Sequence, residues 1–248
     1  MLLVIDVGNS NNVIGLFSEK KLLSHWRIRT EWNRTADEYW VLFKEFVQSS
    51  NVEPDNIDDI VIACVVPSLV PVLQEMAKKY FSSEPLIVGP GIKTGISILY
   101  RNPAEVGADR IVNSVAAYEK YGGPLIIVDF GTATTFDVVS KKGEYLGGVI
   151  FPGIQISLEA LFKHTAKLPR IDMLVPEKVI GKSTVESICF FWLGLSPLVF
   201  LLACFSSNQV LTFYFSVLWR TILDFLSYLV LLCFTWIGMA FLKRFYFQ

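Results

Sequence analysis

Apolar and polar positions along the chain form blocks that predict strands and helices in turn. Continuous apolar runs at Leu2–Ile5, Ile60–Val66 and Leu125–Val128 are typical of strands that are covered on both faces. The segment Leu22–Thr30 instead alternates polar and apolar residues, which is the period of a strand with one face in solvent. This mixture predicts an α/β fold.

Apolar residues also recur at helical spacing. The predicted helices are Thr35–Val47, Leu69–Tyr80, Asp109–Tyr121 and a segment that begins at Ile154. Thr35 is expected to cap the first of them, because Glu38 stands three residues later and completes a capping box.

One short pattern occurs twice at the end of a predicted buried strand. Asp6 is followed by VGNSNN, and Asp129 by FGTATT. Gly8 and Gly131 let the backbone approach a ligand, and successive N–H groups in such a turn bind anions. A carboxylate beside a phosphate requires a cation between them. Two ordinary β-turns are the alternative, but the repetition favours two related half-domains that bind a phosphate.

The segment from Tyr100 to Arg110 offers a second candidate site. Asp109 and Arg110 follow Gly107 and open a predicted helix. A carboxylate in a first helical turn often only compensates the helix dipole. A substrate site is the other interpretation, and these residues alone favour the structural one.

Composition narrows the class of protein. The net charge of −1 indicates no nucleic-acid partner held by electrostatics. The four cysteines and two histidines have no metal-ligand spacing, which predicts free thiols in a reducing compartment and a cytoplasmic protein. Cys64, inside an apolar run, is predicted to be a buried, unreactive thiol.

Six blocks together resemble type III pantothenate kinase, a family of the acetate kinase, sugar kinase, Hsp70 and actin superfamily. The blocks are DVGNSNNV at 6–13, GADR at 107–110, DFGTATT at 129–135, GGVIFPG at 147–153, AKLPRI at 166–171 and GKSTVESI at 181–188. The resemblance implies two ribonuclease-H-like half-domains, at residues 1–123 and 124–188, the second of them incomplete.

The same resemblance implies that the chain phosphorylates pantothenate to 4′-phosphopantothenate, the first step of coenzyme A synthesis. ATP with Mg²⁺ is the implied phosphate donor, and homodimers with pantothenate near the subunit interface are implied as well. A sugar kinase or phosphatase of the same superfamily and a non-catalytic nucleotide-binding protein are the alternatives.

Site residues follow from the motif positions. The resemblance assigns ATP to Asp6, Val7, Gly8, Asn9, Ser10, Asn11, Asn12, Val13 and Thr132, and pantothenate to Tyr100, Gly107, Ala108, Asp109, Arg110 and Thr184. Asp109 is the implied catalytic base. Asp129 is the implied ligand of a monovalent cation, K⁺ or NH₄⁺.

The resemblance ends at Ile188, and the chain changes character there. Residues 189–248 contain only four charged residues, Arg220, Asp224, Lys243 and Arg244, and no glycine pair suited to the family's adenosine turn. One interpretation is an out-of-frame reading, which the abrupt change of composition favours. The other is a membrane hairpin, since Cys189–Phe205 and Phe225–Leu242 are uncharged and close to spanning length. Either would put the activity of this chain in question.

Overall fold

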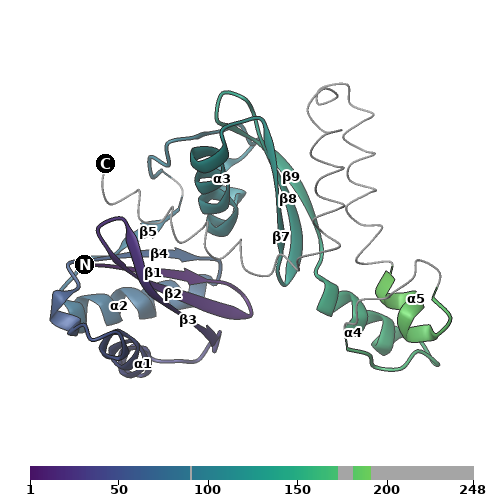
Figure 1. Cartoon of the computed structure of the whole chain (residues 1–248), viewed down its shortest axis with the longest axis horizontal. Coiled ribbons are helices and arrows are strands. Elements are labelled where there is room, and N and C mark those ends of the chain that lie inside the picture. Colours follow the sequence, from purple (N-terminus) through teal and green to yellow (C-terminus); the bar gives the residue numbers. More distant parts are fainter. Residues whose placement is uncertain (90, 173–180, 191–248) are drawn as a thin grey trace. The chain divides into compact units, whose positions relative to one another are not determined.

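The computed structural model describes residues 1–89, 91–172 and 181–190 (Figure 1). Most of the apolar tail predicted at 189–248 therefore lies outside the described residues. Contacts divide the described chain into two compact units: the first holds Met1–Asp129 and Thr135–Val149, and the second holds Phe130–Thr134 and the residues from Ile150 onward. The domain boundary expected after residue 123 stays a prediction.

A five-stranded sheet forms the first half of the first unit. Its strands are β1 (Leu2–Val7), β2 (Asn11–Ser18), β3 (Lys21–Arg29), β4 (Asp59–Cys64) and β5 (Leu86–Val88). The order is β3-β2-β1-β4-β5, with antiparallel pairing among the first three strands and parallel pairing of β1 with β4 and of β4 with β5. This mixed sheet agrees with the ribonuclease-H-like half-domain that the motifs imply.

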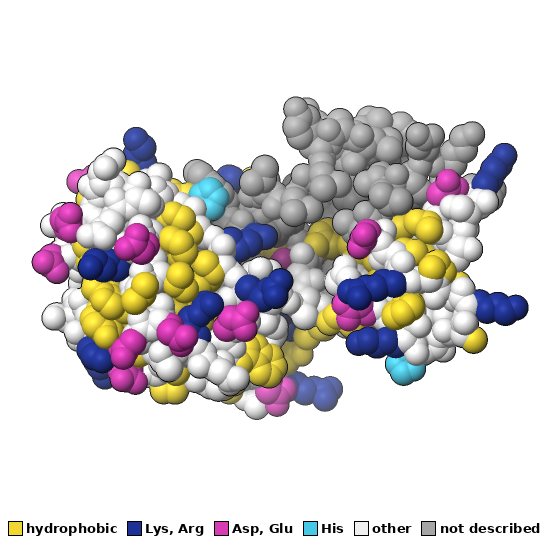
Figure 2. Space-filling view, turned by 90° about the horizontal axis from the view of Figure 1, so that it is seen from below, with side chains coloured by type: hydrophobic (Ala, Val, Ile, Leu, Met, Phe, Trp, Pro, Cys, Tyr) yellow, Lys and Arg dark blue, Asp and Glu magenta, His cyan; other side chains and the backbone are white. Residues whose placement is uncertain are grey.

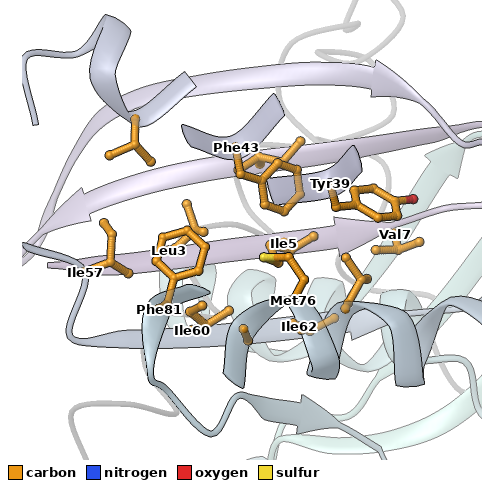
Figure 3. Close-up of a cluster of buried hydrophobic side chains, with 14 of the residues drawn as sticks. Leu3, Ile5, Val7, Tyr39, Phe43, Ile57, Ile60, Ile62, Met76 and Phe81 are labelled. Atoms are coloured by element: carbon orange, nitrogen blue, oxygen red, sulfur yellow. The ribbon is translucent and has the colours of Figure 1, made fainter. Parts of the chain in front are cut away.

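Helices α1 (Ala36–Ser49) and α2 (Val70–Phe81) share one hydrophobic cluster with this sheet (Figure 3). Fully buried members of that cluster include Leu3, Ile5, Tyr39, Phe43 and Met76. The capping box of α1 is confirmed, since the Thr35 hydroxyl accepts from the Glu38 N–H and the Glu38 carboxylate accepts from the Thr35 N–H.

Helix α3 (Ala108–Tyr121) belongs to a different hydrophobic cluster. Val4 of β1 and Val61 of β4 lie in that cluster with Val112 and Val115 of the helix. Successive residues of β1 thus contribute to the α1–α2 cluster and the α3 cluster by turns, because side chains alternate across a strand. The prediction that this strand is covered on both faces is confirmed.

A four-stranded sheet follows in the chain. Its strands are β6 (Ser97–Ile98), β7 (Leu125–Phe130), β8 (Ala133–Val139) and β9 (Glu144–Pro152), in the order β6-β9-β8-β7. Gly143 lies in the turn between β8 and β9 and has a positive φ of 77°. The Tyr118 ring lies where a side chain at this position would project.

Short elements complete the described chain. They are the 3₁₀ helices at Pro54–Asn56, Pro67–Leu69 and Pro103–Glu105, and the helices α4 (Ile154–His164) and α5 (Thr184–Phe190). Among the described residues, no helix combines the length and apolar character needed to cross a membrane. On the face that Figure 2 presents, side chains of both charge signs are interspersed.

The prediction for Cys64 is corrected by its position. It ends β4 and is half-buried, because the strand stops there and the chain turns away from the sheet. Its thiol donates to the Val66 carbonyl at 3.2 Å.

Candidate active site

Thr30 anchors the first phosphate turn, which joins β1 to β2. The Gly8 N–H donates to the Asn11 carbonyl at 3.0 Å and closes the turn. The Thr30 N–H donates to the Ser10 carbonyl at 3.0 Å, and its hydroxyl donates to the Gly8 carbonyl at 2.7 Å. Asn9 and Asn11 are exposed between these anchors. Thr30 therefore fixes the backbone of the turn, while the Asn9 and Asn11 side chains of the turn face solvent.

Asn12 lies beneath this turn and is fully buried. Its amide nitrogen donates to the Tyr39 hydroxyl at 3.0 Å, and its amide oxygen accepts from the Thr30 hydroxyl at 2.7 Å. Val7 and Val13 are buried as well. Within the predicted ATP segment, these three side chains support the turn from the core.

Replacing Thr30 with valine keeps the side-chain shape but leaves the Gly8 carbonyl and the Asn12 amide without their donor. We expect a loss of about 1–3 kcal/mol in the free energy of unfolding, together with a higher KM for ATP. Urea denaturation and steady-state kinetics measure the two effects. Thr30→Ser should restore both, and Thr165→Val, which removes an exposed hydroxyl bonded to the Leu161 carbonyl, should change neither. Unaltered stability and KM in Thr30→Val would disprove the anchoring role.

The second phosphate turn joins β7 to β8 and meets the start of α4. The Gly131 N–H donates to the Ala133 carbonyl at 3.0 Å, and the Gly153 N–H donates to the Thr132 carbonyl at 2.9 Å. A Cβ at Gly153 would overlap the carbonyls of Gly131 and Thr132. The close approach of this turn and the helix therefore requires glycine at position 153.

Three predicted site carboxylates come close enough to one another to interact. Asp6 lies next to the end of β1, Asp109 lies in the first turn of α3, and Asp129 lies next to the end of β7. Burial, followed by the charges of Asp109 and Asp129, raises the pKa of Asp6 to about 7. Burial, followed by the charges of Asp109 and Asp137, raises the pKa of Asp129 to about 6. Carboxylates that oppose one another's ionisation favour a bound cation.

The surroundings of these carboxylates suit a cation that is shared with a ligand. Within the part of the chain that the structure describes, no three His, Cys, Asp or Glu residues form a group that could hold a metal. Mg²⁺ that arrives with a nucleotide needs only one or two protein carboxylates, because phosphates supply other ligands. Asp129 is oriented by Asn113, whose amide donates to its Oδ2 at 3.1 Å. Its remaining acceptor capacity suits a cation ligand.

The raised pKa of Asp6 predicts how stability depends on pH. Aspartates of the unfolded chain titrate at about pH 3.9, so the folded protein binds more protons than the unfolded chain between about pH 4 and 7. Stability from this group is complete below about pH 4 and is lost as the pH rises through about 7.

Asp6→Asn removes the titrating carboxyl and therefore the dependence of stability on pH that this carboxyl causes. In urea denaturation without nucleotide or divalent metal, we expect the variant to gain stability relative to the natural chain between pH 5 and pH 8. Asp55→Asn, at an exposed position, should stay parallel to the natural chain. The same pH dependence in the Asp6 variant and the natural chain would contradict the assignment.

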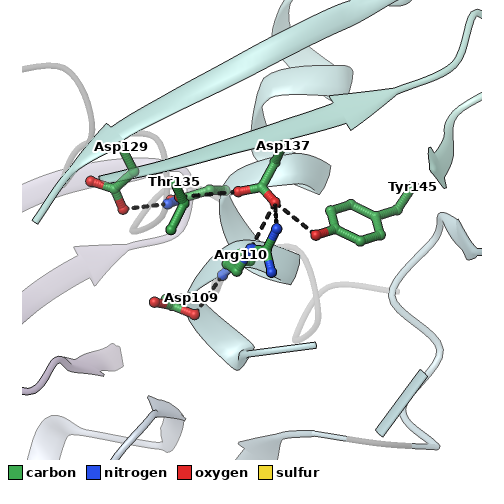
Figure 4. A network of polar contacts seen from close by, with 7 residues as sticks. Asp109, Arg110, Asp129, Thr135, Asp137 and Tyr145 are labelled. Carbon is green, nitrogen blue, oxygen red and sulfur yellow. Dashed lines mark hydrogen bonds and ion pairs between the residues drawn. The ribbon is translucent and has the colours of Figure 1, made fainter. Parts of the chain in front are cut away.

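Asp109 and Arg110 have different environments although they are neighbours. Gly107 leaves room for the Asp109 carboxylate, since a Cβ there would overlap its Oδ1. Burial raises the pKa of Asp109. Arg110 is buried, and its Nε donates to Asp137 Oδ1 at 2.8 Å (Figure 4).

Sequence reasoning missed Asp137 and Tyr145. The one available signal was a charged residue between Phe136 and the two valines that end β8. Tyr145 lies beside two predicted pantothenate residues: the Tyr100 ring centroid is 6.3 Å from its own, and the Arg110 guanidinium carbon is 5.8 Å from it. The first unit thus brings Tyr100 and Arg110 to one tyrosine.

Thr132 and Thr184 belong to the second unit. Thr184 begins α5 and is exposed. Their predicted contacts with ATP and pantothenate stay predictions.

Known proteins match most of the chain. A relative from Anaeromyxobacter sp. is 55% identical over 188 residues, which are 76% of this chain and 74% of that one, and one from Citrifermentans bemidjiense is 53% identical over 199 residues, 79% and 78%. Both are named type III pantothenate kinase. Among solved structures, a protein from Campylobacter jejuni described as a Baf family transcriptional activator matches with a TM-score of 0.48 and 20% identity, covering 81% of this chain and 77% of that one. The model of the type III pantothenate kinase family matches residues 2–190, and the chain belongs to that family.

Proposed function

We propose that this chain transfers the γ-phosphoryl group of ATP to the primary hydroxyl of pantothenate, the first step of coenzyme A synthesis. Relatives with 53–55% identity carry the name of this activity. The observation that carries the proposal to this chain's own residues is the electrostatic coupling of Asp109 to Asp6 and Asp129. This coupling connects the predicted base with the aspartate that precedes each phosphate turn.

Asp109 serves as the base in this proposal. Phosphoryl transfer depends on positioning and charge neutralisation, so Asp109 orients the acceptor hydroxyl and accepts its proton late in the reaction. Its raised pKa makes the carboxylate a better proton acceptor than an exposed aspartate.

ATP is assigned in this proposal to the segment Asp6–Val13, whose turn presents Asn9 and Asn11 to solvent. The motif positions add Thr132 as a further ATP residue. Mg²⁺ bound with ATP relieves the repulsion between the phosphates and the carboxylates. Asp129 gives a carboxylate oxygen to K⁺ or NH₄⁺, whose charge offsets that of the cluster.

Pantothenate contacts Tyr100, Gly107–Arg110 and Thr184. We further propose that the enzyme is a cytoplasmic homodimer.

A non-catalytic nucleotide-binding protein is the second candidate. The observation that favours it is the end of the family match at residue 190, which leaves about a quarter of each relative unmatched. The choice between the two candidates therefore depends on whether residues 189–248 are an out-of-frame reading or a membrane hairpin.

An ATP-consumption assay with the full chain separates the candidates. The kinase predicts that ADP forms only with pantothenate, that phosphopantothenate is detected by mass spectrometry, and that K⁺ or NH₄⁺ stimulates the reaction. ATP binding without pantothenate-dependent turnover would favour the non-catalytic protein. An intact mass with resequencing across the Ile188 codon establishes which tail the tested protein carries, and membrane fractionation tests the hairpin.

A further inference from the structure

Asp137 is a buried carboxylate on β8 that gathers donors from three positions in the first unit. Its Oδ1 accepts from Arg110 Nε at 2.8 Å and from the Tyr145 hydroxyl at 2.7 Å, and Arg110 Nη2 lies 2.6 Å away as an ion pair. Its Oδ2 accepts from the Thr135 hydroxyl at 3.3 Å. Figure 4 shows Asp137 between these residues. The Arg110 and Asp137 side chains are only 8% and 1% exposed.

This arrangement is a poor device for stabilising a fold. Desolvation of two buried charges costs about as much as their attraction returns, and apolar residues of similar volume often serve as well. Three donors also crowd Asp137 Oδ1, which has two lone pairs. Arg110 Nη2 correspondingly makes no aligned hydrogen bond within the described part of the chain. A contribution to stability therefore does not explain why the Arg110 guanidinium is buried here.

The neighbours of the pair supply that reason. The Arg110 N–H donates to Asp109 Oδ1 at 2.8 Å, so the backbone of Arg110 is tied to the proposed base. The Tyr145 ring packs against both the Arg110 guanidinium and the Tyr100 ring. Gly148 of β9 leaves room for Arg110, since a Cβ there would lie 2.7 Å from Arg110 Nη2. A Cβ at Gly147 would only touch the Tyr100 ring, at 3.4 Å.

We propose that Asp137 and Tyr145 are positioning residues that fix Arg110 and Tyr100 for the acceptor substrate without contacting it themselves. Asp137 holds the guanidinium through Nε and Nη2, which sets its plane. Tyr145 hydrogen-bonds the same carboxylate oxygen and packs against Tyr100, so one side chain sets the position of both. Burial raises the pKa of the Tyr145 hydroxyl, which therefore remains a donor. The inference deepens the proposed function and rests on it for the identity of the acceptor.

Tyr145→Phe in the full chain removes only the hydroxyl. We expect the KM for pantothenate to rise about tenfold, the loss expected for a hydrogen bond to a charged group. The KM for ATP and kcat should change by less than about twofold. Tyr80→Phe is the matched control, because it removes a hydroxyl that donates to an exposed carboxylate, Asp37, at 2.6 Å. Equal changes in both KM values, or no change in that for pantothenate, would overturn the proposal.

A double-mutant cycle shows whether Tyr145 acts through Arg110. In the Arg110→Lys background, Tyr145→Phe should add less than about twofold to the KM for pantothenate, because the planar guanidinium is already gone. Asp137→Asn should likewise lose most of its effect in that background. If Tyr145→Phe and Asp137→Asn raise the KM for pantothenate as much in the Arg110→Lys background as in the natural chain, these residues do not act through Arg110. The proposal would then fail.

A measurement without substrate separates this inference from the proposed function. Hydrogen exchange of the Arg110 Nε–H, followed by nitrogen-15 NMR and assigned with Arg110→Lys, reports how firmly the guanidinium is held. Tyr145→Phe should accelerate this exchange several-fold, whereas Tyr80→Phe should not. Unchanged exchange overturns the positioning role. Accelerated exchange in a chain without pantothenate-dependent turnover supports the positioning role and rejects the proposed function.

Discussion

Asp109→Asn is expected to lower kcat for pantothenate phosphorylation by about 10²–10⁴-fold, the usual contribution of a general base. The amide keeps the shape of the side chain, and its oxygen can still accept from the Arg110 N–H that now donates to Asp109 at 2.8 Å. It cannot take the proton of the acceptor hydroxyl. Pantothenate binding should therefore remain close to that of the natural chain. Coupled-assay kinetics and isothermal titration calorimetry measure the two quantities.

Asp55→Asn is the matched control for this prediction. It makes the same chemical change at an exposed position of the 3₁₀ helix Pro54–Asn56, and kcat should stay within about twofold. Thermal unfolding of the Asp109 variant should show a folded protein, because removing one of three mutually repelling carboxylates relieves unfavourable charge. Undiminished turnover in Asp109→Asn would remove this residue from the mechanism.

Local periodicity was sufficient to predict three strands of the first sheet, β1, β3 and β4, and the helices α1 and α2. The alternation along Leu22–Thr30 appears in β3, where every second side chain is exposed. The capping pair Thr35 and Glu38 forms as predicted because all of its atoms lie within one helical turn. The two-residue strand β6 was not predicted, since Ser97 and Ile98 join the second sheet only by pairing with distant Glu144 and Tyr145. Pairing between distant segments produces no periodic pattern of apolar and polar residues in the sequence.

The candidate site was predictable where glycine and aspartate mark strand ends, and unpredictable where partners meet through the fold. Asp6 and Asp129 carry their own turn signals, so their positions were confirmed as strand-end carboxylates. The burial of Asn12 was not expected, because an asparagine after a glycine turn is typical of an exposed loop. Its partner Tyr39 comes from α1, 27 residues away. A single sequence contains no record of that contact.

Gly148→Ala is expected to lower the free energy of unfolding by about 3 kcal/mol or more, at the upper end of the cost of overpacking. A Cβ at this position would overlap the Phe136 carbonyl oxygen of the neighbouring strand and lie 2.7 Å from Arg110 Nη2. The arginine head can move, but the carbonyl is backbone of the adjacent strand β8, which yields less easily than a side chain. For a chain of this size, we expect the melting temperature to fall by about 6–12 °C.

Gly89→Ala provides the comparison, since a Cβ there meets no atom of the described residues within 4 Å, and its stability should change by less than about 0.5 kcal/mol. Gly148→Ala should also raise the KM for pantothenate more than that for ATP, because the added methyl group displaces the guanidinium that Asp137 holds. Differential scanning calorimetry and kinetics measure the two effects separately. A melting temperature within 1 °C of the natural chain's would mean that β9 yields easily at Gly148. The close approach of β8 and β9 would then impose no requirement for glycine, and Arg110 would owe its position to Asp137 and Tyr145 alone.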